Sequence, residues 1–328
     1  IDYAEEEISQ RASALTDKLL FDLCTHTFKG CVIAPMGRTY RGVIYPFLQG
    51  TQAIINLIDT SAPYSYGEGW IAYLATSKYQ LPDGLLERTK ENLEITYDSG
   101  VHSPREESYN RWENIHILKN ENIDMDTHEY TKSMNECFHG TTFFGPGIYG
   151  YQQHMWYAGL DPEAVLFVNH PGASSENTKS RPGYWDGNGV MPALKQVHGM
   201  LGAIYGIPEN HPIHFTHVYC PIRRFTKAET EENWIFLHKG SGYIALWSSG
   251  NMVPYNDRIF DCEFRVYGEM NSYLCICGKV SEYPSFESFK NYARSLEPEF
   301  DKESLTLKAK KGYVLQYRKV IDHTQYVD

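Results

Sequence analysis

Residues 243–280 decide the fold and read YIALWSSGNMVPYNDRIFDCEFRVYGEMNSYLCICGKV. Three short apolar runs, at residues 243–248, 263–267 and 273–280, are separated in this stretch by Gly, Pro, Asn and Asp. Runs rich in aromatic and β-branched residues between such turn residues are typical of neighbouring strands in an antiparallel sheet. The stretch therefore predicts successive strands of a mainly β fold.

Runs of the same kind occur on both sides of this stretch, at residues 93–97, 114–118, 164–168, 305–308 and 313–317. Many short strands with turn signals between them indicate antiparallel sheets stacked as a sandwich. Residues 285–295 are the exception, because Phe286, Phe289 and Tyr292 recur there at helical spacing. We therefore assign residues 91–328 to an antiparallel β-sandwich domain.

The first ninety residues have a different pattern. Residues 5–23 place Ile8, Leu15, Leu19 and Leu20 at helical spacing, and residues 49–59 and 69–77 predict further short helices. We assign residues 1–90 to a helical segment. A few helices cannot bury their apolar faces alone, so they either pack on the sandwich or end a larger helical body. We favour the second arrangement and expect an upstream helical segment.

Composition limits the classes of partner. The formal net charge of −11 argues against nucleic acid, whose phosphates attract a basic surface. No apolar run is long enough for a membrane span. The seven cysteines form no framework of regular spacing, which predicts buried free thiols and a cytoplasmic location. Aromatic residues make up 14% of the chain, and they suit either a β-rich core or stacking on sugar rings.

Residues 149–219 concentrate the side chains that can carry chemistry. The first group is YGYQQHMW at residues 149–156. On a strand, Gln152, His154 and Trp156 would share one face. Such a set suits the floor of a sugar-binding cleft, and it also fits a hydrogen-bonded histidine behind a core tryptophan. Both interpretations stay open.

The second group begins with NHPG at residues 169–172 and continues through Glu176 to RPGYWDGNG at residues 181–189. A buried strand that opens into a loop of charged and aromatic residues is a usual place for a functional site. The planar fork of Arg181 suits a carboxylate, and Asn188 can donate to the same group. A long structural turn is the alternative.

The third group is HPIHFTHVY at residues 211–219. If the segment is extended, His211, His217 and Tyr219 share one face. Two histidines on one face can bind a metal such as zinc, with His170 and Glu176 as further ligands. We favour a site without a cofactor, and zinc is the alternative.

The order of these motifs resembles the C-terminal half of heparinase II/III-like proteins. The similar segments are GRTY at 37–40, YQQHMW at 151–156, NHPG at 169–172, RPGYWDGNG at 181–189, FTHVY at 215–219 and GSGYIAL at 240–246. The resemblance implies the end of an α/α toroid followed by an antiparallel β-supersandwich, with the active cleft between them. Most of the toroid has no counterpart in this sequence.

The resemblance also implies an enzyme that cleaves uronic-acid-containing oligo- or polysaccharides by β-elimination. His154 or His217 would be the base and Tyr184 or Tyr219 the acid, while Arg181 and Asn188 would hold the carboxylate. The remaining residues expected to contact substrate are Arg38, Tyr40, Gln152, Trp156, His170 and Trp185. The other partner would be an N-terminal helical region of the same protein or a second copy of the chain.

Two other functions stay open. A glycoside hydrolase on the same scaffold needs two carboxylates, for which Glu176 and Asp186 are the candidates. A non-catalytic glycan-binding sandwich would instead use Trp156 and Trp185 as stacking surfaces.

Overall fold

The protein is described by a computed structural model, which covers residues 1–33, 35, 50–65, 72, 76–102, 110–130, 134–136, 140–142, 153–175, 180, 182–257 and 260–318. It is mainly β, with antiparallel sheets and few helices. Residues 243–280 contribute to β15 (Gly242–Ser248), β17 (Phe260–Tyr267) and β18 (Met270–Lys279), as predicted. An additional strand, β16 (Val253–Asp257), lies between the first two along the chain.

Two large sheets make up most of the molecule. The first has eight strands in the order β16-β17-β12-β9-β8-β5-β4-β3, and the second has six in the order β10-β11-β18-β15-β14-β13. The further strands of the eight-stranded sheet are β3 (Leu93–His102), β4 (Asn110–Lys119), β5 (Asp124–Tyr130), β8 (Trp156–Asp161), β9 (Ala164–Asn169) and β12 (Phe215–Tyr219). Those of the six-stranded sheet are β10 (Ala193–Val197), β11 (Met200–Gly206), β13 (Lys227–Glu231) and β14 (Trp234–Lys239).

Small elements complete the described chain. Two hairpins pair β1 (Thr27–Phe28) with β2 (Cys31–Val32) and β6 (Met134–Glu136) with β7 (Gly140–Thr142). A three-stranded sheet contains β19 (Glu299–Asp301), β20 (Thr306–Ala309) and β21 (Tyr313–Gln316), and a 3₁₀ turn, η3, covers Ile222–Arg224.

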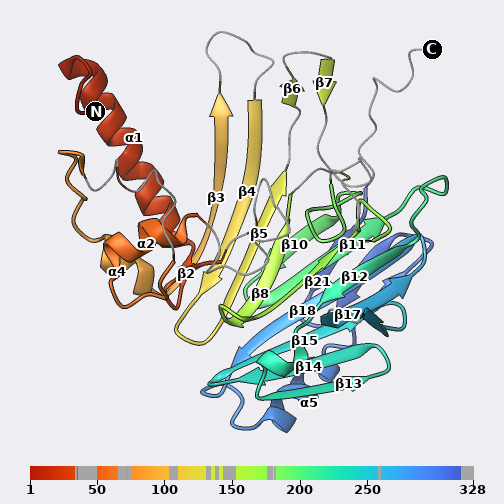
Figure 1. Cartoon of the computed structure of the whole chain (residues 1–328). Helices are drawn as coiled ribbons and strands as arrows, with labels where there is room; N and C mark the ends of the chain where they lie inside the picture. Colours follow the sequence, from red (N-terminus) through yellow and green to blue (C-terminus); the bar gives the residue numbers. More distant parts are fainter. Residues whose placement is uncertain are drawn as a thin grey trace.

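The two large sheets pack face to face around the main core. Trp156 and Leu166 contribute from the eight-stranded sheet, and Leu201 and Ile244 contribute from the six-stranded sheet. A hydrogen bond of 2.5 Å between the hydroxyls of Thr216 and Tyr273 also crosses the interface. The alternation of side chains along each strand puts one face of each sheet into this core. The described chain is therefore built as a sandwich of antiparallel sheets (Figure 1).

The outer face of the six-stranded sheet is covered by the C-terminal region. Helix α5 (Phe286–Ser295) begins at Ser285, whose hydroxyl accepts a hydrogen bond from the backbone N–H of Ser288 at 3.0 Å. Its Phe289 packs with Leu307 and Tyr313 of the three-stranded sheet in a second core. The helix predicted at residues 285–295 is thereby confirmed.

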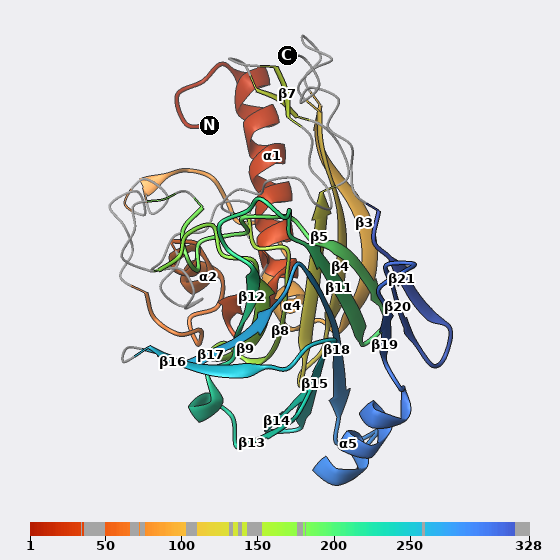
Figure 2. The same ribbon diagram turned by 90° about the vertical axis from the view of Figure 1, so that its right-hand side faces the viewer.

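The helices of the first ninety residues lie by the eight-stranded sheet. Those within the described residues are α1 (Glu6–Thr25), α2 (Gln52–Ile58) and α4 (Leu85–Lys90), and both views place them away from α5 (Figures 1 and 2). The buried ammonium of Lys119 on β4 fastens them to the sheet, because it donates to the carbonyls of Thr25 at 2.8 Å and Thr27 at 2.9 Å. No helix in the described part of the chain is long and apolar enough to cross a membrane.

Helix α1 keeps most of its predicted apolar stripe exposed. Ile8 is 58% exposed and Leu15 and Leu19 are each 59% exposed, whereas Leu20 is buried. The helix therefore buries only its C-terminal end against the rest of the described chain, and its spacing alone did not indicate this division.

Three details differ from the sequence expectations or fall outside them. Of residues 149–156, the structure describes 153–156, and within these four residues strand structure begins at Trp156. The helix predicted at residues 69–77 lies mostly outside the described residues. The six cysteines that the structure describes are buried free thiols, as predicted.

Candidate functional site

The outer face of the eight-stranded sheet gathers several of the predicted site residues. On β12, Thr216 and Val218 face the main core, so Phe215, His217 and Tyr219 face outward. The prediction that His217 and Tyr219 share one face is correct. His211 precedes the strand and belongs to a different group of side chains.

A loop at residues 182–189 lies over this face and carries Tyr184 and Trp185. The backbone N–H of Gly172 donates to the carbonyl of Gly183 at 3.0 Å, which joins the two arms of the loop. Gly187 has a φ of 115°, a conformation that an L-residue rarely adopts. Gly187 therefore has a clear geometric reason to be in this loop.

Trp185 and His217 form a close aromatic stack. Their ring centroids are 3.8 Å apart and the interplanar angle is 6°. Tyr184 meets the same imidazole edge-on at 4.6 Å. Since His217 is fully buried and Trp185 is 3% exposed, the indole acts as a cover over the imidazole.

Glu263 and Arg265 of β17 join Tyr184 in a hydrogen-bond network. The hydroxyl of Tyr184 donates to Oε1 of Glu263. Arg265 donates from Nη2 to the Tyr184 hydroxyl at 2.5 Å and from Nε to Glu263 Oε1 at 2.7 Å. Nδ1 of His217 is 3.6 Å from the same carboxylate oxygen, which is an electrostatic contact longer than a hydrogen bond.

Aromatic rings hold the guanidinium of Arg265 on both sides. It lies 3.4 Å from the ring centroid of Tyr255 and 4.3 Å from that of Phe215. The Arg265 side chain is 12% exposed, and Tyr255 on the edge strand is 38% exposed. Cation–π contacts of this kind fix the plane of the guanidinium while leaving its charge in place.

The protonation states in this group follow from burial and from the charges nearby. Burial lowers the pKa of His217, so its imidazole is neutral near pH 7. Burial and the hydrogen bond to Glu263 raise the pKa of Tyr184, which keeps its phenol protonated. Burial alone would raise the pKa of Glu263, but His217, Tyr184 and Arg265 together hold it below its ordinary value. The network therefore contains a carboxylate, a guanidinium, a protonated phenol and a neutral imidazole.

His154 borders the same cluster but is already engaged. Its Nε2 donates to the carbonyl of Trp185 at 2.8 Å, and its ring lies 4.7 Å from that of Phe167. Burial lowers the pKa of His154 to about 4. Tyr219 stacks on the same Phe167 ring, with 4.9 Å between the ring centroids. Both predicted residues belong to the aromatic packing around His217.

Asn169 and His217 are buried polar side chains at the centre of the site whose polar atoms have no hydrogen-bond partner among the described residues. They are directly opposite each other in the pairing of β9 with β12. Asn169 is 1% exposed, and neither its Oδ1 nor its Nδ2 has a hydrogen-bond partner among the described residues. Neither ring nitrogen of His217 has one there either. Such buried polar groups are rare in folded proteins, and a catalytic role is one of the reasons for which they are kept.

Asn188 has a structural environment that differs from the predicted one. Its Oδ1 accepts from the backbone N–H of His170 at 3.1 Å, and its Nδ2 donates to the carbonyl of Gln153 at 2.9 Å. Asn188 is fully buried, so both polar atoms of its amide are used in holding the loop. The carboxylate-binding role predicted for Asn188 therefore has no free amide to support it.

His170 and His211 form a separate buried pair beside Asn188. Their ring centroids are 4.6 Å apart, and Nε2 of His170 donates to the carbonyl of Ile213 at 3.1 Å. Burial lowers the pKa of His170 to about 3. Within the described ranges, no three His, Cys, Asp or Glu side chains are placed to hold a metal ion. The zinc alternative thus gains no ligand set from the described residues.

The remaining predicted site residues lie in different places. Trp156 is 1% exposed in the core between the sheets, where it cannot stack on a sugar, and it does not share a surface with His154. Asp186 is buried with its carboxylate against Gly183. Five predicted site residues lie outside the described residues, namely Arg38, Tyr40, Gln152, Glu176 and Arg181.

Glu263, Arg265 and Asn169 were not singled out from the sequence. On β17, Glu263 and Arg265 alternate with Phe264 and Val266, so the pattern of one strand already places both charges on the face opposite the core. Asn169 ends an apolar strand within a motif that the sequence argument did select. Its lack of a partner is a property of the fold that no local pattern reports.

Comparison of this chain with protein-family models, with curated proteins and with solved structures found no match.

Proposed function

We propose that this chain is the β-rich part of an enzyme that cleaves uronic-acid-containing glycans by β-elimination. The observation that carries the proposal is the convergence of three separate motifs. His154, Trp185 and His217 come from distant segments of the sequence and meet on one outer face of the eight-stranded sheet. Those segments are among the ones that resemble heparinase II/III-like proteins.

The chemistry of elimination requires a base, an acid and a group that offsets the carboxylate charge. His217 suits the base better than His154, because it is neutral and its ring nitrogens lack hydrogen-bond partners among the described residues. Nε2 of His154 is committed to a backbone carbonyl, and its pKa of about 4 makes it a weak base.

Tyr184 suits the acid better than Tyr219. Its hydroxyl is protonated and lies within a network that can exchange its proton, whereas Tyr219 is stacked on Phe167. Arg265 donates to that hydroxyl and brings a positive charge to the same place. We assign Arg265 the charge-offsetting role that the sequence argument gave to Arg181.

The finer architecture is part of the same proposal. We infer that the sandwich is a β-supersandwich and that the N-terminal helices are the end of an α/α toroid. The exposed apolar stripe of α1 supports a further helical surface against this helix, because exposed apolar residues at helical spacing favour a packing partner. Such a surface would form the other wall of the cleft.

The two alternatives have less support. Trp156 and Trp185 are both buried, which disfavours a binding sandwich that stacks sugars on them. The hydrolase alternative relied on Glu176 and Asp186, and Asp186 is buried against Gly183. Glu263 is a nearby carboxylate, but Tyr184 and Arg265 both bond to it.

The test is incubation of the protein with a panel of uronate glycans, followed by the ultraviolet absorbance of an unsaturated uronate and by reducing-end release. Both signals should rise together. His217→Gln and Tyr184→Phe should each lower the rate by about 10²- to 10⁴-fold, as expected when a general base or acid is removed. Tyr292→Phe, on the distant helix α5, is the matched control and should keep the full rate. Reducing ends without absorbance would reject elimination.

A further inference from the structure

The junction between the helical segment and the eight-stranded sheet contains two carboxyl groups that the proposed elimination does not use. Asp124 and Asp126 alternate on β5 with Met125, which faces the main core, so both carboxyl groups face outward. Asp124 is 1% exposed and Asp126 is fully buried. Among the described residues, Oδ1 of Asp124 and Oδ1 of Asp126 have no hydrogen-bond partner. Two buried carboxyl groups this close to each other favour keeping a proton over carrying two negative charges.

The second oxygen of each carboxyl group has a partner in a neighbouring element. Oδ2 of Asp126 is 2.9 Å from Nδ1 of His26, the residue that follows the last turn of α1. Oδ2 of Asp124 accepts a hydrogen bond of 2.5 Å from the hydroxyl of Tyr157 on β8. Asp126 is therefore a direct contact between β5 and the C-terminal end of α1.

The buried ammonium of Lys119 lies beside the pair and binds the same end of α1. Lys119 on β4 is directly opposite Asp124 in the strand register. Its ammonium donates to the carbonyls of Thr25 and Thr27, so its hydrogen bonds are used in holding the helical segment. Counting Lys119 and the two carboxyl groups, the charges balance when the pair keeps one proton. Loss of that proton leaves one negative charge in excess.

That excess charge would lie at the end of α1 where it is least favourable. The C-terminal end of a helix carries a partial negative charge, so a nearby carboxylate is destabilising there. Cys24 and Thr25, at this end, are buried, whereas Ile8, Leu15 and Leu19 are exposed. Figure 1 shows α1 leading away from the strands toward its N-terminus. The contacts at the C-terminal end therefore decide whether α1 stays on the sheet.

We propose that Asp124 and Asp126 form a proton-dependent latch, which holds the C-terminal end of α1 on β5 while the pair shares one proton and releases it when that proton leaves. The sandwich stays folded in both states, because its main core lies on the opposite face of the sheet. The latch is independent of the proposed elimination and gives the helical segment a pH-dependent attachment to the sheet.

The direction of the pH dependence follows from burial. Burial and the neighbouring Asp126 raise the pKa of Asp124 well above its ordinary value, and burial raises the pKa of Asp126 to about 7. An exposed aspartate has a pKa of about 3.9. The contribution of the protonated pair is therefore fully present below about pH 3.9 and is lost as the pH rises through about 7.

Other charged and titratable side chains surround the pair and its neighbour Lys119, and each enters the titration of the cluster. They are His128 of β5, Tyr157 of β8, Tyr97 of β3, Arg88 of α4, Cys277 of β18, and Cys24 and His26 at the end of α1.

The test is amide hydrogen exchange followed by mass spectrometry at pH 5 and pH 8, corrected for the intrinsic effect of pH on exchange. A peptide from the end of α1, residues 17–25, is compared with one from β11 in the main core, residues 200–206. The opening equilibrium at the end of α1 should rise by at least about tenfold between the two pH values, because one pKa unit is a factor of ten. Residues 200–206 should keep their protection.

The variant that decides the inference replaces both carboxyl groups, Asp124→Asn with Asp126→Asn. Neither amide ionises, so the end of α1 should be equally protected at pH 5 and pH 8. Asp126→Asn alone should show a smaller rise than the wild type, and it serves if the double variant does not fold. Asp83→Asn removes an exposed charge just before α4 and is the matched control, which should follow the wild type.

Three results would overturn the latch. The first is wild-type protection at residues 17–25 that does not change with pH. The second is an equal loss of protection at residues 200–206, which would show unfolding of the whole sandwich. The third is a full wild-type response to pH in the variants of Asp124 and Asp126.

Discussion

The imidazole of His217 lies parallel to the indole of Trp185, with 3.8 Å between ring centroids and an angle of 6°. One residue comes from the middle of β12 and the other from an irregular loop. The stack therefore does two things at once: it completes the packing of the outer face and it covers the polar side chain at the centre of the site.

Trp185→Ala should destabilise the protein strongly. Removing a buried tryptophan costs about 3–5 kcal/mol of unfolding free energy. Trp185 is 3% exposed and contacts Tyr184, His217 and Tyr219. Urea denaturation measures the change. Trp234→Ala, at a half-buried position stacked on Phe236, is the control and should lose less. Equal losses in the two variants would contradict the packing described.

Asn169 and Asn188 should respond in opposite ways to replacement by alanine. Asn169→Ala removes an amide without partners, so the unfolding free energy should stay unchanged or rise. Asn188→Ala leaves a backbone N–H and a carbonyl unpaired, which should cost about 2–4 kcal/mol. Urea denaturation of both variants at pH 7 makes the comparison. A large loss for Asn169→Ala would instead show that Asn169 has a structural role.

These two asparagines show which features of the site could be predicted from the sequence and which could not. The motif NHPG and the loop that contains Asn188 were both selected, and the loop was correctly expected to lie at the site. Asn188 was predicted as the binding amide because it lies in a loop of charged and aromatic residues. In the fold, the side-chain amide of Asn188 is hydrogen-bonded to the backbone of His170 and Gln153. The side-chain amide of Asn169, in contrast, has no hydrogen-bond partner among the described residues. Hydrogen-bond satisfaction depends on tertiary contacts, which local residue patterns do not contain.

Strand positions were easier to predict than side-chain environments. Alternation correctly placed His217 and Tyr219 together, because the period of two along a strand is a local property. It gave the wrong environment for Trp156, since the strand begins there and the preceding His154 belongs to the irregular segment. Glu263 and Arg265 could have been found from the same alternation on β17, although their link to Tyr184 required the loop to fold over the sheet.

Glu263→Gln should destabilise the protein in a manner that depends on pH. The side chain of Arg265 is only 12% exposed, and loss of a partly buried partner charge costs about 3 kcal/mol. The pKa of Glu263 is held below its ordinary value in the fold. Its stabilising contribution is therefore present above the unfolded pKa of about 4.3 and is lost as the pH falls through the folded pKa.

The measurement is urea denaturation of wild type and Glu263→Gln between pH 3 and pH 8. The gap between them should be wide at pH 7 and close in acid. Glu94→Gln, which breaks an exposed pair with His198, is the control and should change stability by less than about 1 kcal/mol. A gap that stays constant with pH would contradict the assigned charge on Glu263.

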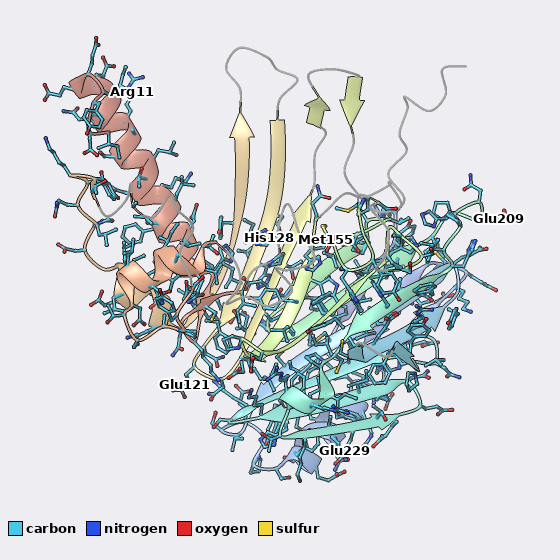
Figure 3. The ribbon with its side chains drawn as sticks, viewed as in Figure 1. Arg11, Glu121, His128, Met155, Glu209 and Glu229 are labelled. Carbon is cyan, nitrogen blue, oxygen red and sulfur yellow. The ribbon has the colours of Figure 1, made fainter. Side chains whose placement is uncertain are left out.

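Asp126→Asn should change the pH dependence of stability in the direction opposite to that of Glu263→Gln. Asp126 is fully buried near the C-terminal end of α1, where Nδ1 of His26 is 2.9 Å from its Oδ2 and where the charges of His128, Lys119 and Asp124 also act on it. Figure 3 shows His128 on this sheet next to Met155, whose carbonyl accepts its backbone N–H. Burial raises the pKa of Asp126 to about 7.

The folded wild type then keeps a proton that the unfolded chain releases near about pH 4, so its stability should fall as the pH rises from about 4 to about 7. Asp126→Asn cannot ionise and should show a shallower fall over that window. Glu209→Gln, on an exposed turn, is the control and should follow the wild type. Parallel stability curves for Asp126→Asn and wild type would contradict the raised pKa.

The most direct test of the central claim is the mass of the products formed from a uronate glycan in water enriched with ¹⁸O. Elimination adds no water across the cleaved bond, so one product should be an unsaturated uronate whose mass lacks the water that hydrolysis would add, and the bond cleavage itself should introduce no ¹⁸O. Incorporation of one ¹⁸O atom per cleaved bond would show hydrolysis and contradict the assignment of His217 and Tyr184 as the base and acid of an elimination.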